Sequence, residues 1–287
     1  RLFDPKAVAV IGATDRPGSV GRPVMHNLTE AGFAGKVYPI NPTRKTVNDL
    51  PAYPCVSEAP GEIDLAVICT PAPTVPGLIN ECGEKGIRAV IILSAGFGEV
   101  GGDGQALQKQ VTDAARAFDG LRIVGPNCLG AIVPAIGLNA SFAAGTPETG
   151  HLAFVSQSGA LCTSVLDWAM QQHIGFSHFI SIGNMLDVTF ADLIDYFGQS
   201  PQTRSIMLYI ESITDARQFM SAARAFSRTK PIIAYKAGRF PRSAKAAMSH
   251  TGALAGEDDV YEAAFQRAGV EGGVEVGDVF ERAHLLA

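Results

Sequence analysis

The sequence has 287 residues, of which 47% are apolar and 18% charged, and its net charge is −5. At roughly 100–200 residues per domain this length predicts two domains, and the composition is that of a globular chain rather than a disordered one. There is no basic stripe, no apolar run near the roughly 20 residues that a membrane span needs, and no signal peptide, which argues against nucleic acid and membranes as partners. The five cysteines form no CxxC pair: Cys55, Cys69, Cys82, Cys128 and Cys162. This indicates reduced thiols in a cytoplasmic protein rather than disulfides or a zinc site.

The first half alternates short apolar runs with longer helical stretches, and glycines mark the turns. This pattern is typical of βα units around a parallel sheet. The predicted strands are Ala7–Ile11, Val37–Ile40, Leu65–Cys69, Ala89–Leu93 and Arg122–Val124, and the predicted helices are Gly21–Glu30, Val75–Lys85 and Gly104–Phe118. We therefore predict a first α/β domain over residues 1–129.

A stretch rich in Gly, Ala, Pro and Thr without clear periodicity, Gly130–Gly150, is predicted to link the domains. A second α/β series follows over residues 151–287. Its predicted strands are His151–Val155, Phe179–Ile182, Ile206–Ile210, Pro231–Tyr235 and Gly273–Val276, and its predicted helices are Gly159–Gln171, Thr189–Phe197, Asp215–Arg228 and Asp258–Ala268. Because the chain opens on Arg1 and stops within a predicted helix, we expect an excised piece or one part of a larger polypeptide.

The turn after the first strand, Gly12–Gly21, is rich in glycine and leads into a helix, so it can present backbone N–H groups to a phosphate. Its spacing is not the GxGxxG of a dinucleotide site. The second strand ends in Asn41-Pro42 and then Arg44-Lys45, where a dinucleotide site normally places an acid. Two cations favour a ligand with extra phosphate, either coenzyme A or NADP. A solvated loop explains Arg44 and Lys45 equally well.

Three further strands end in loops rich in proline and glycine: Thr70–Pro73, Ser94–Glu99 and Gly125–Gly130. Open α/β sheets bind ligands at the carboxyl ends of their strands, so these loops predict a stiff cleft in which backbone approaches the ligand closely. Cys128 by itself is as well explained as a small buried apolar residue.

The second half has a further anion-binding pattern, Ser156-Gln157-Ser158-Gly159, at a predicted helix start. Serine there is also a common N-cap. The sharper feature is His250, which lies among small residues between the strand Pro231–Tyr235 and the last predicted helix. Neutral imidazole is a competent nucleophile near pH 7, and Glu211 at the end of the strand Ile206–Ile210 can orient it. A loop histidine without such surroundings is usually a surface residue.

These motifs, in this order and spacing, resemble the α subunit of succinyl-CoA synthetase and, more closely, the α part of ADP-forming acetyl-CoA synthetases. The resemblance covers nearly the whole chain and rests on Gly125–Cys128, Ser156–Gly159 and Ser249–Ala253. It implies a Rossmann-like CoA-binding domain followed by a flavodoxin-like α/β domain.

The resemblance also implies roles for single residues. His250 is expected to be phosphorylated, Glu211 to hold the phosphorylated ring, and the phosphate to contact Ser156, Gln157, Ser158, Gly159, Thr251 and Gly252. CoA is expected to contact Gly12, Ala13, Thr14, Ser19, Val20, Gly21, Asn41, Pro42, Lys45, Thr70, Pro71, Pro73, Ser94, Gly96, Phe97, Asn127 and Cys128. No metal ligand is expected in this chain.

The implied reaction is acid + CoA + ATP ⇌ acyl-CoA + ADP + phosphate, through an acyl phosphate and a phosphohistidine. ATP, ADP and Mg²⁺ are expected to bind only to an ATP-grasp subunit or domain outside this sequence, in a hetero- or homo-oligomer. The acyl group and the choice of ADP or GDP stay open.

Two alternatives remain open at this point. One is the CoA-sensing region of a protein lysine acetyltransferase, where a similar region has lost the histidine; the presence of His250 and Glu211 argues against it. The other is an NAD(P)-dependent oxidoreductase, which the absent GxGxxG and the absent acid after the second strand disfavour.

Overall fold

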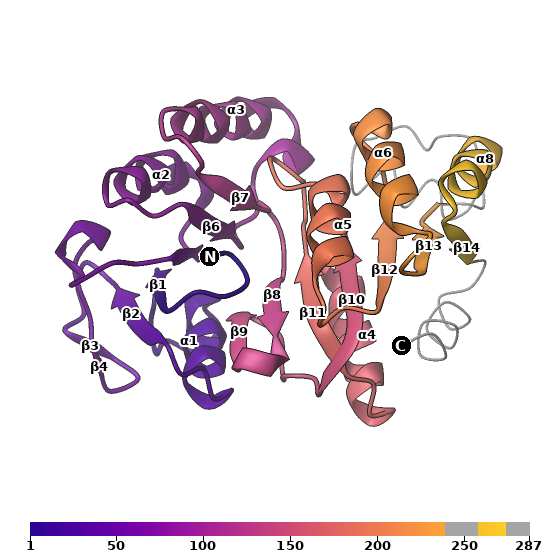
Figure 1. The fold of residues 1–287 in the computed structure, drawn as a ribbon. Helices are drawn as coiled ribbons and strands as arrows, with labels where there is room; N and C mark the ends of the chain where they lie inside the picture. The colour runs from indigo at the N-terminus through magenta and orange to yellow at the C-terminus, as the bar shows by residue number, and fades with distance from the viewer. Residues whose placement is uncertain (239–257, 274–287) are drawn as a thin grey trace. The chain divides into compact units, whose positions relative to one another are not determined.

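The computed structural model describes residues 1–238 and 258–273 (Figure 1). The chain divides into two compact units. Unit 1 comprises Arg1–Thr146 together with Ser181–Asp187, and unit 2 comprises Pro147–Ile180 together with the residues from Val188 onward. Within the described ranges, no helix combines the length and the apolar character that a membrane crossing requires.

Unit 1 is built on a parallel sheet with the strand order β2-β1-β5-β6-β7. Its strands are β1 (Ala7–Ile11), β2 (Lys36–Ile40), β5 (Leu65–Ile68), β6 (Ala89–Ile92) and β7 (Arg122–Val124). The helices α2 (Val75–Glu84) and α3 (Gly102–Arg116) cover one face and α1 (Gly21–Glu30) covers the other (Figure 1). Burial on both faces explains why β1 and β5 are continuous apolar runs. The predicted α/β fold is confirmed here.

The strand order of unit 1 reverses between β1 and β5. The chain passes from β1 to β2 on one side of the sheet, whereas β5, β6 and β7 lie on the other side. A reversal of this kind opens a crevice at the carboxyl ends of the two central strands. The residues after β1 and β5 are therefore the place to look for a ligand.

The predicted link Gly130–Gly150 contains regular structure. β8 (Gly130–Val133) and β9 (Leu138–Ser141) form an antiparallel pair, and β10 begins at Thr149. All residues of β8 and β9 are buried, so the sequence shows no alternation from which strands could be predicted. The side chain of Asn27 on α1 donates to the carbonyl oxygens of Ser141 and Ala143, at 2.9 and 2.8 Å, and so ties this region to unit 1.

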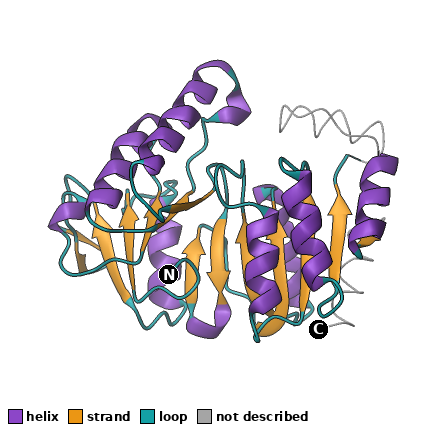
Figure 2. Cartoon of the chain, turned by 45° about the horizontal axis from the view of Figure 1, so that its top comes forward, coloured by secondary structure: helices purple, strands orange, loops and turns teal. Residues whose placement is uncertain are grey.

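In unit 2 the strands follow the order β14-β13-β12-β10-β11. They are β10 (Thr149–Ser156), β11 (Phe176–Ser181), β12 (Ser205–Ile210), β13 (Ile232–Lys236) and β14 (Glu271–Gly273), and Figure 2 shows them flanked by helices. The helices are α4 (Gly159–Gln171), α5 (Phe190–Gln199), α6 (Ala216–Phe226) and α8 (Asp258–Ala268).

Three strands of unit 2 begin two or three residues earlier than the sequence predicts, and the first is β10, which begins at Thr149 rather than His151. β11 begins at Phe176 rather than Phe179. Ser177 and His178 are buried in the strand although they are polar, so the apolar pattern of the sequence does not mark its first residues. β14 begins at Glu271 rather than Gly273.

Candidate functional site

The turn after β1 folds back on the first turn of α1. Gly12 has φ +91°, and its N–H donates to the carbonyl oxygen of Ile40 at 3.0 Å. A Cβ on Gly12 would lie 2.9 Å from Cγ2 of Thr70, and a Cβ on Gly21 would overlap the carbonyl oxygen of Gly12. Only glycine allows these close approaches of backbone. The structure thus brings the predicted residues Gly12, Gly21 and Thr70 together at the reversal of strand order.

The residues after β2 hold the other side of this turn. The Asn41 side chain donates to the carbonyl oxygen of Ala13 at 2.8 Å. Arg44 donates to Asp15 at 2.9 Å, and the other carboxylate oxygen of Asp15 accepts the backbone N–H of Asn48 at 3.0 Å. The two predicted cations therefore differ, since Arg44 is paired within the turn whereas Lys45 is exposed.

A hollow of about 370 Å³ lies beside this turn, lined by Arg22, Pro23, His26 and Asn48. Sequence reasoning treated His26 as a residue without a role and did not single out Arg22. Both residues lie near the N-terminus of the helix that follows the glycine-rich turn. Because helix N-termini attract anions, this position could have indicated a role in phosphate binding. The hollow adds two basic side chains to the predicted phosphate-binding region.

The loops after β5, β6 and β7 are joined by hydrogen bonds. Ser94 Oγ donates to the carbonyl oxygen of Thr70 at 2.5 Å, and the Asn127 N–H donates to the carbonyl oxygen of Ser94 at 2.9 Å. The side chains of Phe97 and Cys128 are buried, at 0% and 3% exposure, so they pack in the core rather than line a cleft. Of the predicted contacts, the exposed ones here are Pro71 and Pro73.

In unit 2 the predicted phosphate turn and the predicted acid are directly connected. Gln157, 8% exposed, accepts the backbone N–H groups of Glu211 and Ser212 through Oε1, at 2.6 and 2.9 Å. Ser158 is the N-cap of α4 and accepts from the N–H of Leu161 at 3.3 Å. Gln157 therefore fixes the strand end that carries Glu211 against the turn at the start of α4.

A buried lysine that sequence reasoning missed lies at the end of β13. Lys236 is 4% exposed, donates to the carbonyl oxygen of Ala237 at 2.5 Å, and places Nζ 4.8 Å from the ring centroid of Tyr261. Burial lowers the pKa of Lys236, while Asp258 and Glu211 act in the opposite direction. Applying the strand-end rule to β13 would have found this residue.

Tyr209 stacks on Tyr235, with ring centroids 5.4 Å apart. Burial, with smaller contributions from Glu211 and Tyr235, raises the pKa of Tyr209 to about 12. The predicted residues His250, Thr251 and Gly252 lie outside the described residues. Among the residues that are described, no group of three or more His, Cys, Asp or Glu side chains could hold a metal ion.

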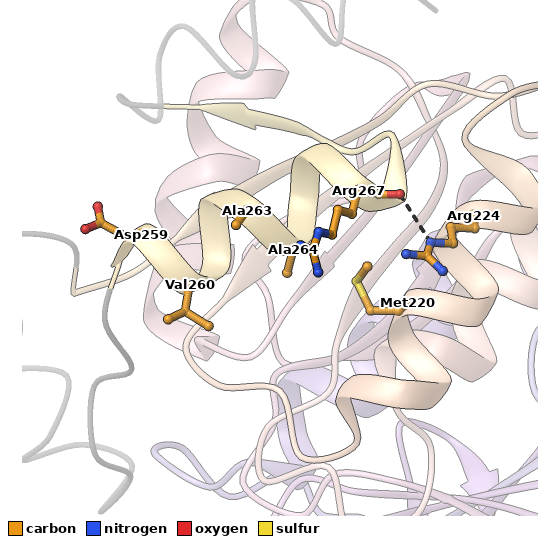
Figure 3. Close-up of a pocket in the computed structure, with 7 residues that line it drawn as sticks. All are labelled: Met220, Arg224, Asp259, Val260, Ala263, Ala264 and Arg267. Carbon is orange, nitrogen blue, oxygen red and sulfur yellow. Dashed lines mark hydrogen bonds between the residues drawn. The ribbon is translucent and has the colours of Figure 1, made fainter.

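A second hollow, of about 470 Å³, lies between α6 and α8 (Figure 3). Its lining residues are Met220, Arg224, Asp259, Val260, Ala263, Ala264 and Arg267. Arg224 Nε donates to the carbonyl oxygen of Arg267 at 3.2 Å across it. Of the predicted site residues that the structure describes, none lines this hollow.

Two family models match the chain. The model described as a CoA binding domain matches residues 6–134, and the model described as a succinyl-CoA ligase like flavodoxin domain matches residues 149–286. The matches and the two α/β units define a protein with a CoA-binding domain followed by a ligase-type flavodoxin domain.

Relatives with assigned names narrow this class. The chain is 44% identical to the α subunit of acetate–CoA ligase [ADP-forming] I from Pyrococcus furiosus, over all of this chain and 63% of the relative. It is 42% identical to 4-hydroxybutyrate–CoA ligase [ADP-forming] from Nitrosopumilus maritimus, over 93% of this chain and 39% of the relative.

A solved structure agrees with these matches. The structure of a dinucleotide forming acetyl-coenzyme A synthetase 1 from Ca. Korarchaeum cryptofilum, in complex with phosphate and ADP, has a TM-score of 0.94 at 40% identity. The match covers 99% of this chain and 61% of the chain in the solved structure. The chain belongs to the family of the α subunits and α parts of ADP-forming acyl-CoA synthetases. It spans less than two thirds of these three relatives.

Proposed function

We propose that the chain is the CoA-binding and phosphohistidine-carrying part of an NDP-forming acyl-CoA synthetase. The proposal is supported by the two hydrogen bonds that Gln157 accepts from the backbone N–H groups of Glu211 and Ser212, because they hold the turn Ser156–Gly159 beside the strand end that carries Glu211. Acetate and 4-hydroxybutyrate ligases are both among the relatives, so the acyl group stays open. The acetyltransferase alternative receives no support from these relatives.

In the proposed reaction, the thiolate of CoA and inorganic phosphate exchange on the acyl carbon. Phosphate attacks the carbonyl of acyl-CoA, the C–S bond breaks, CoA leaves as the thiolate, and an acyl phosphate results. An imidazole nitrogen of His250 then attacks phosphorus, the P–O bond to the acyl group breaks, and the carboxylate leaves. The phosphohistidine delivers its phosphoryl group to ADP on a partner ATP-grasp subunit or domain. Two in-line transfers replace one transfer between distant groups.

The residues of this chain have distinct proposed roles in that sequence. The start of α4 is proposed to offer backbone N–H groups and positive potential to the phosphoryl group. The N–H groups of Gln157 and Ser158 are bonded to the carbonyl oxygen of Tyr209 and to Ser156 Oγ. Glu211 accepts a hydrogen bond from the ring nitrogen of His250 that does not carry phosphorus, and so steadies the charged ring. The carboxylate of Glu211 lies within electrostatic reach of the buried ammonium of Lys236 and acts to raise the pKa of Lys236.

CoA is proposed to bind unit 1 at the reversal of strand order. The turn Gly12–Gly21 at the start of α1 is proposed to offer backbone N–H groups to its diphosphate, and Lys45, Arg22 and His26 to attract its 3′-phosphate. An acid that would select the ribose hydroxyls of NAD does not follow β2; Asp15, on the turn after β1, is paired with Arg44.

Calorimetric titration of the chain with CoA, dephospho-CoA and NADP⁺ tests this site. We expect CoA to bind most tightly, and Lys45→Ala to weaken CoA roughly threefold to tenfold while leaving dephospho-CoA unchanged, because the lost contact is to the 3′-phosphate. Lys36→Ala is the matched control, since Lys36 is exposed at the opposite end of β2. Equal affinity for CoA and dephospho-CoA, or tighter binding of NADP⁺, would contradict the proposal.

A further inference from the structure

One short segment of the chain belongs to a different unit from its neighbours on both sides. Ser181–Asp187 is part of unit 1, whereas Pro147–Ile180 and the residues from Val188 onward form unit 2. Its end is anchored on β7, because one carboxylate oxygen of Asp187 accepts from Arg122 Nε at 2.9 Å and from the N–H of Ile123 at 2.8 Å. The second half of the sequence thus contributes a segment to the first unit.

This segment packs directly against the backbone of the loop after β7. Gly183 has φ +50°, and a Cβ there would overlap the carbonyl oxygens of Pro126 and Asn127. The next N–H, that of Asn184, donates to the carbonyl oxygen of Pro126 at 2.9 Å. Glycine at 183 is what allows the two backbones to approach so closely.

The side chain of Asn184 joins two loops at the carboxyl edge of the unit 1 sheet. Its Nδ2 donates to Glu99 Oε2 at 2.6 Å, in the loop after β6. Its Oδ1 accepts from Asn127 Nδ2 at 3.3 Å, in the loop after β7. One amide thus fixes both loops relative to each other.

Glu99 extends the effect of Asn184 to the backbone of the loop after β6. Its carboxylate accepts the N–H of Gly96 at 2.5 Å and the N–H of Phe97 at 3.2 Å. Burial acts to raise the pKa of Glu99, but the bonds from Gly96, Asn184 and Phe97 outweigh it, so the pKa lies below its ordinary value. These N–H groups are satisfied by a protein carboxylate, so this loop has little capacity left for a phosphate.

The strand order indicates which part of a long ligand meets these loops. β6 and β7 lie two and three strands from β1. Neighbouring strands are about 4.8 Å apart, so the two loops lie roughly 10–14 Å along the edge from the turn after β1. A ligand with its diphosphate at that turn and an extended uncharged arm would place the end of the arm there.

We propose that Asn184 is a positioning residue for the thiol end of CoA. Through its bonds to Glu99 and Asn127, Asn184 holds the loops after β6 and β7 in the conformation that receives the arm. It belongs to the half of the sequence that also contains His250. The inference rests on the proposed binding of CoA to unit 1. It adds a residue on which binding of the uncharged arm of CoA depends, whereas binding of the nucleotide part does not depend on it.

Calorimetry with two ligands separates positioning from folding. CoA carries both the nucleotide and the arm, whereas adenosine 3′,5′-bisphosphate carries the nucleotide alone. We expect Asn184→Ala to weaken CoA roughly tenfold to a hundredfold, on the scale of a hydrogen bond to a charged group, and to leave the bisphosphate within about twofold. Asn80→Ala is the matched control, because Asn80 is exposed on α2.

A second pair of variants keeps the test valid if Asn184→Ala folds poorly. Asn184→Asp places two carboxylates in contact, so its affinity for CoA should be low at neutral pH and recover as the pH falls and one of them is protonated. Adding Glu99→Gln to Asn184→Asp restores a donor and an acceptor at this contact, so CoA affinity should return to near the wild-type value at neutral pH.

The outcomes are distinguishable. If the wild-type chain binds neither CoA nor the bisphosphate, the proposed function fails and this inference fails with it. If the wild type binds both, the inference is overturned when Asn184→Ala binds CoA as tightly as the wild type, or loses both ligands equally. Failure of the Glu99→Gln and Asn184→Asp pair to restore CoA affinity would overturn it as well.

Discussion

The role of Gln157 predicts a measurable loss of stability when its acceptor oxygen is removed. Gln157→Ala deletes the two hydrogen bonds that Oε1 accepts from the N–H groups of Glu211 and Ser212, at 2.6 and 2.9 Å, and a longer one from Nε2 to Ser212 Oγ at 3.4 Å. A net hydrogen bond contributes about 0.5–1.5 kcal/mol, and a buried donor left without a partner costs about 1–3 kcal/mol. Glu211 and Ser212 are half-buried, so water can replace part of the loss. We therefore expect the free energy of unfolding to fall by about 1–3 kcal/mol.

Trp168 makes this loss easy to follow. It is the single tryptophan of the chain and lies on α4, the helix that begins directly after Gln157 and Ser158. Urea unfolding monitored by its fluorescence reports on unit 2, and the midpoint should shift to lower urea without a change in the slope of the transition.

Two controls separate the hydrogen bonds from packing. Gln157→Met keeps the length of the side chain without its acceptor oxygen, so it should lose about as much as Gln157→Ala. Gln171→Ala changes an exposed glutamine at the end of the same helix and should lie within about 0.5 kcal/mol of the wild type. A stable Gln157→Met variant would refute the assignment of the loss to the two backbone bonds.

Two further predictions concern the phosphohistidine and the pH dependence of stability. The full enzyme incubated with labelled ATP should form an acid-labile, base-stable protein phosphate, and His250→Asn should abolish it. Glu211→Gln should slow its formation by roughly 10²–10⁴-fold. Full labelling of the His250→Asn variant would refute the mechanism. Burial lowers the pKa of His178 to about 4 in the folded chain, below the ordinary value of 6.5. The unfolded chain therefore binds more protons between these values, so stability should fall as the pH drops from 6.5 to 4, and His178→Phe should remove that part of the dependence in urea titrations.

The α/β class, most strand positions and the place of the site were accessible from local patterns. Parallel strands buried on both faces appear as short apolar runs, and the residues after them mark the carboxyl edge whatever the strand order. Gly12, Thr70, Ser156 and Glu211 were predicted as site residues in this way. The motifs that carry the family resemblance are local as well, and the family matches agree with them.

Other features depend on contacts between residues far apart in the sequence. β8 and β9 are buried on both sides by tertiary packing, so no periodicity marks them. The sequence does not distinguish Arg44 from Lys45, and both are exposed in the structure, but the fold places Asp15 against Arg44. The contact between Asn184 and Glu99 joins residues 85 positions apart, and the neighbours of Asn184 on both sides belong to the other unit. A local pattern contains no information on such pairs, because their proximity depends on the strand order and on the path of the chain between the units.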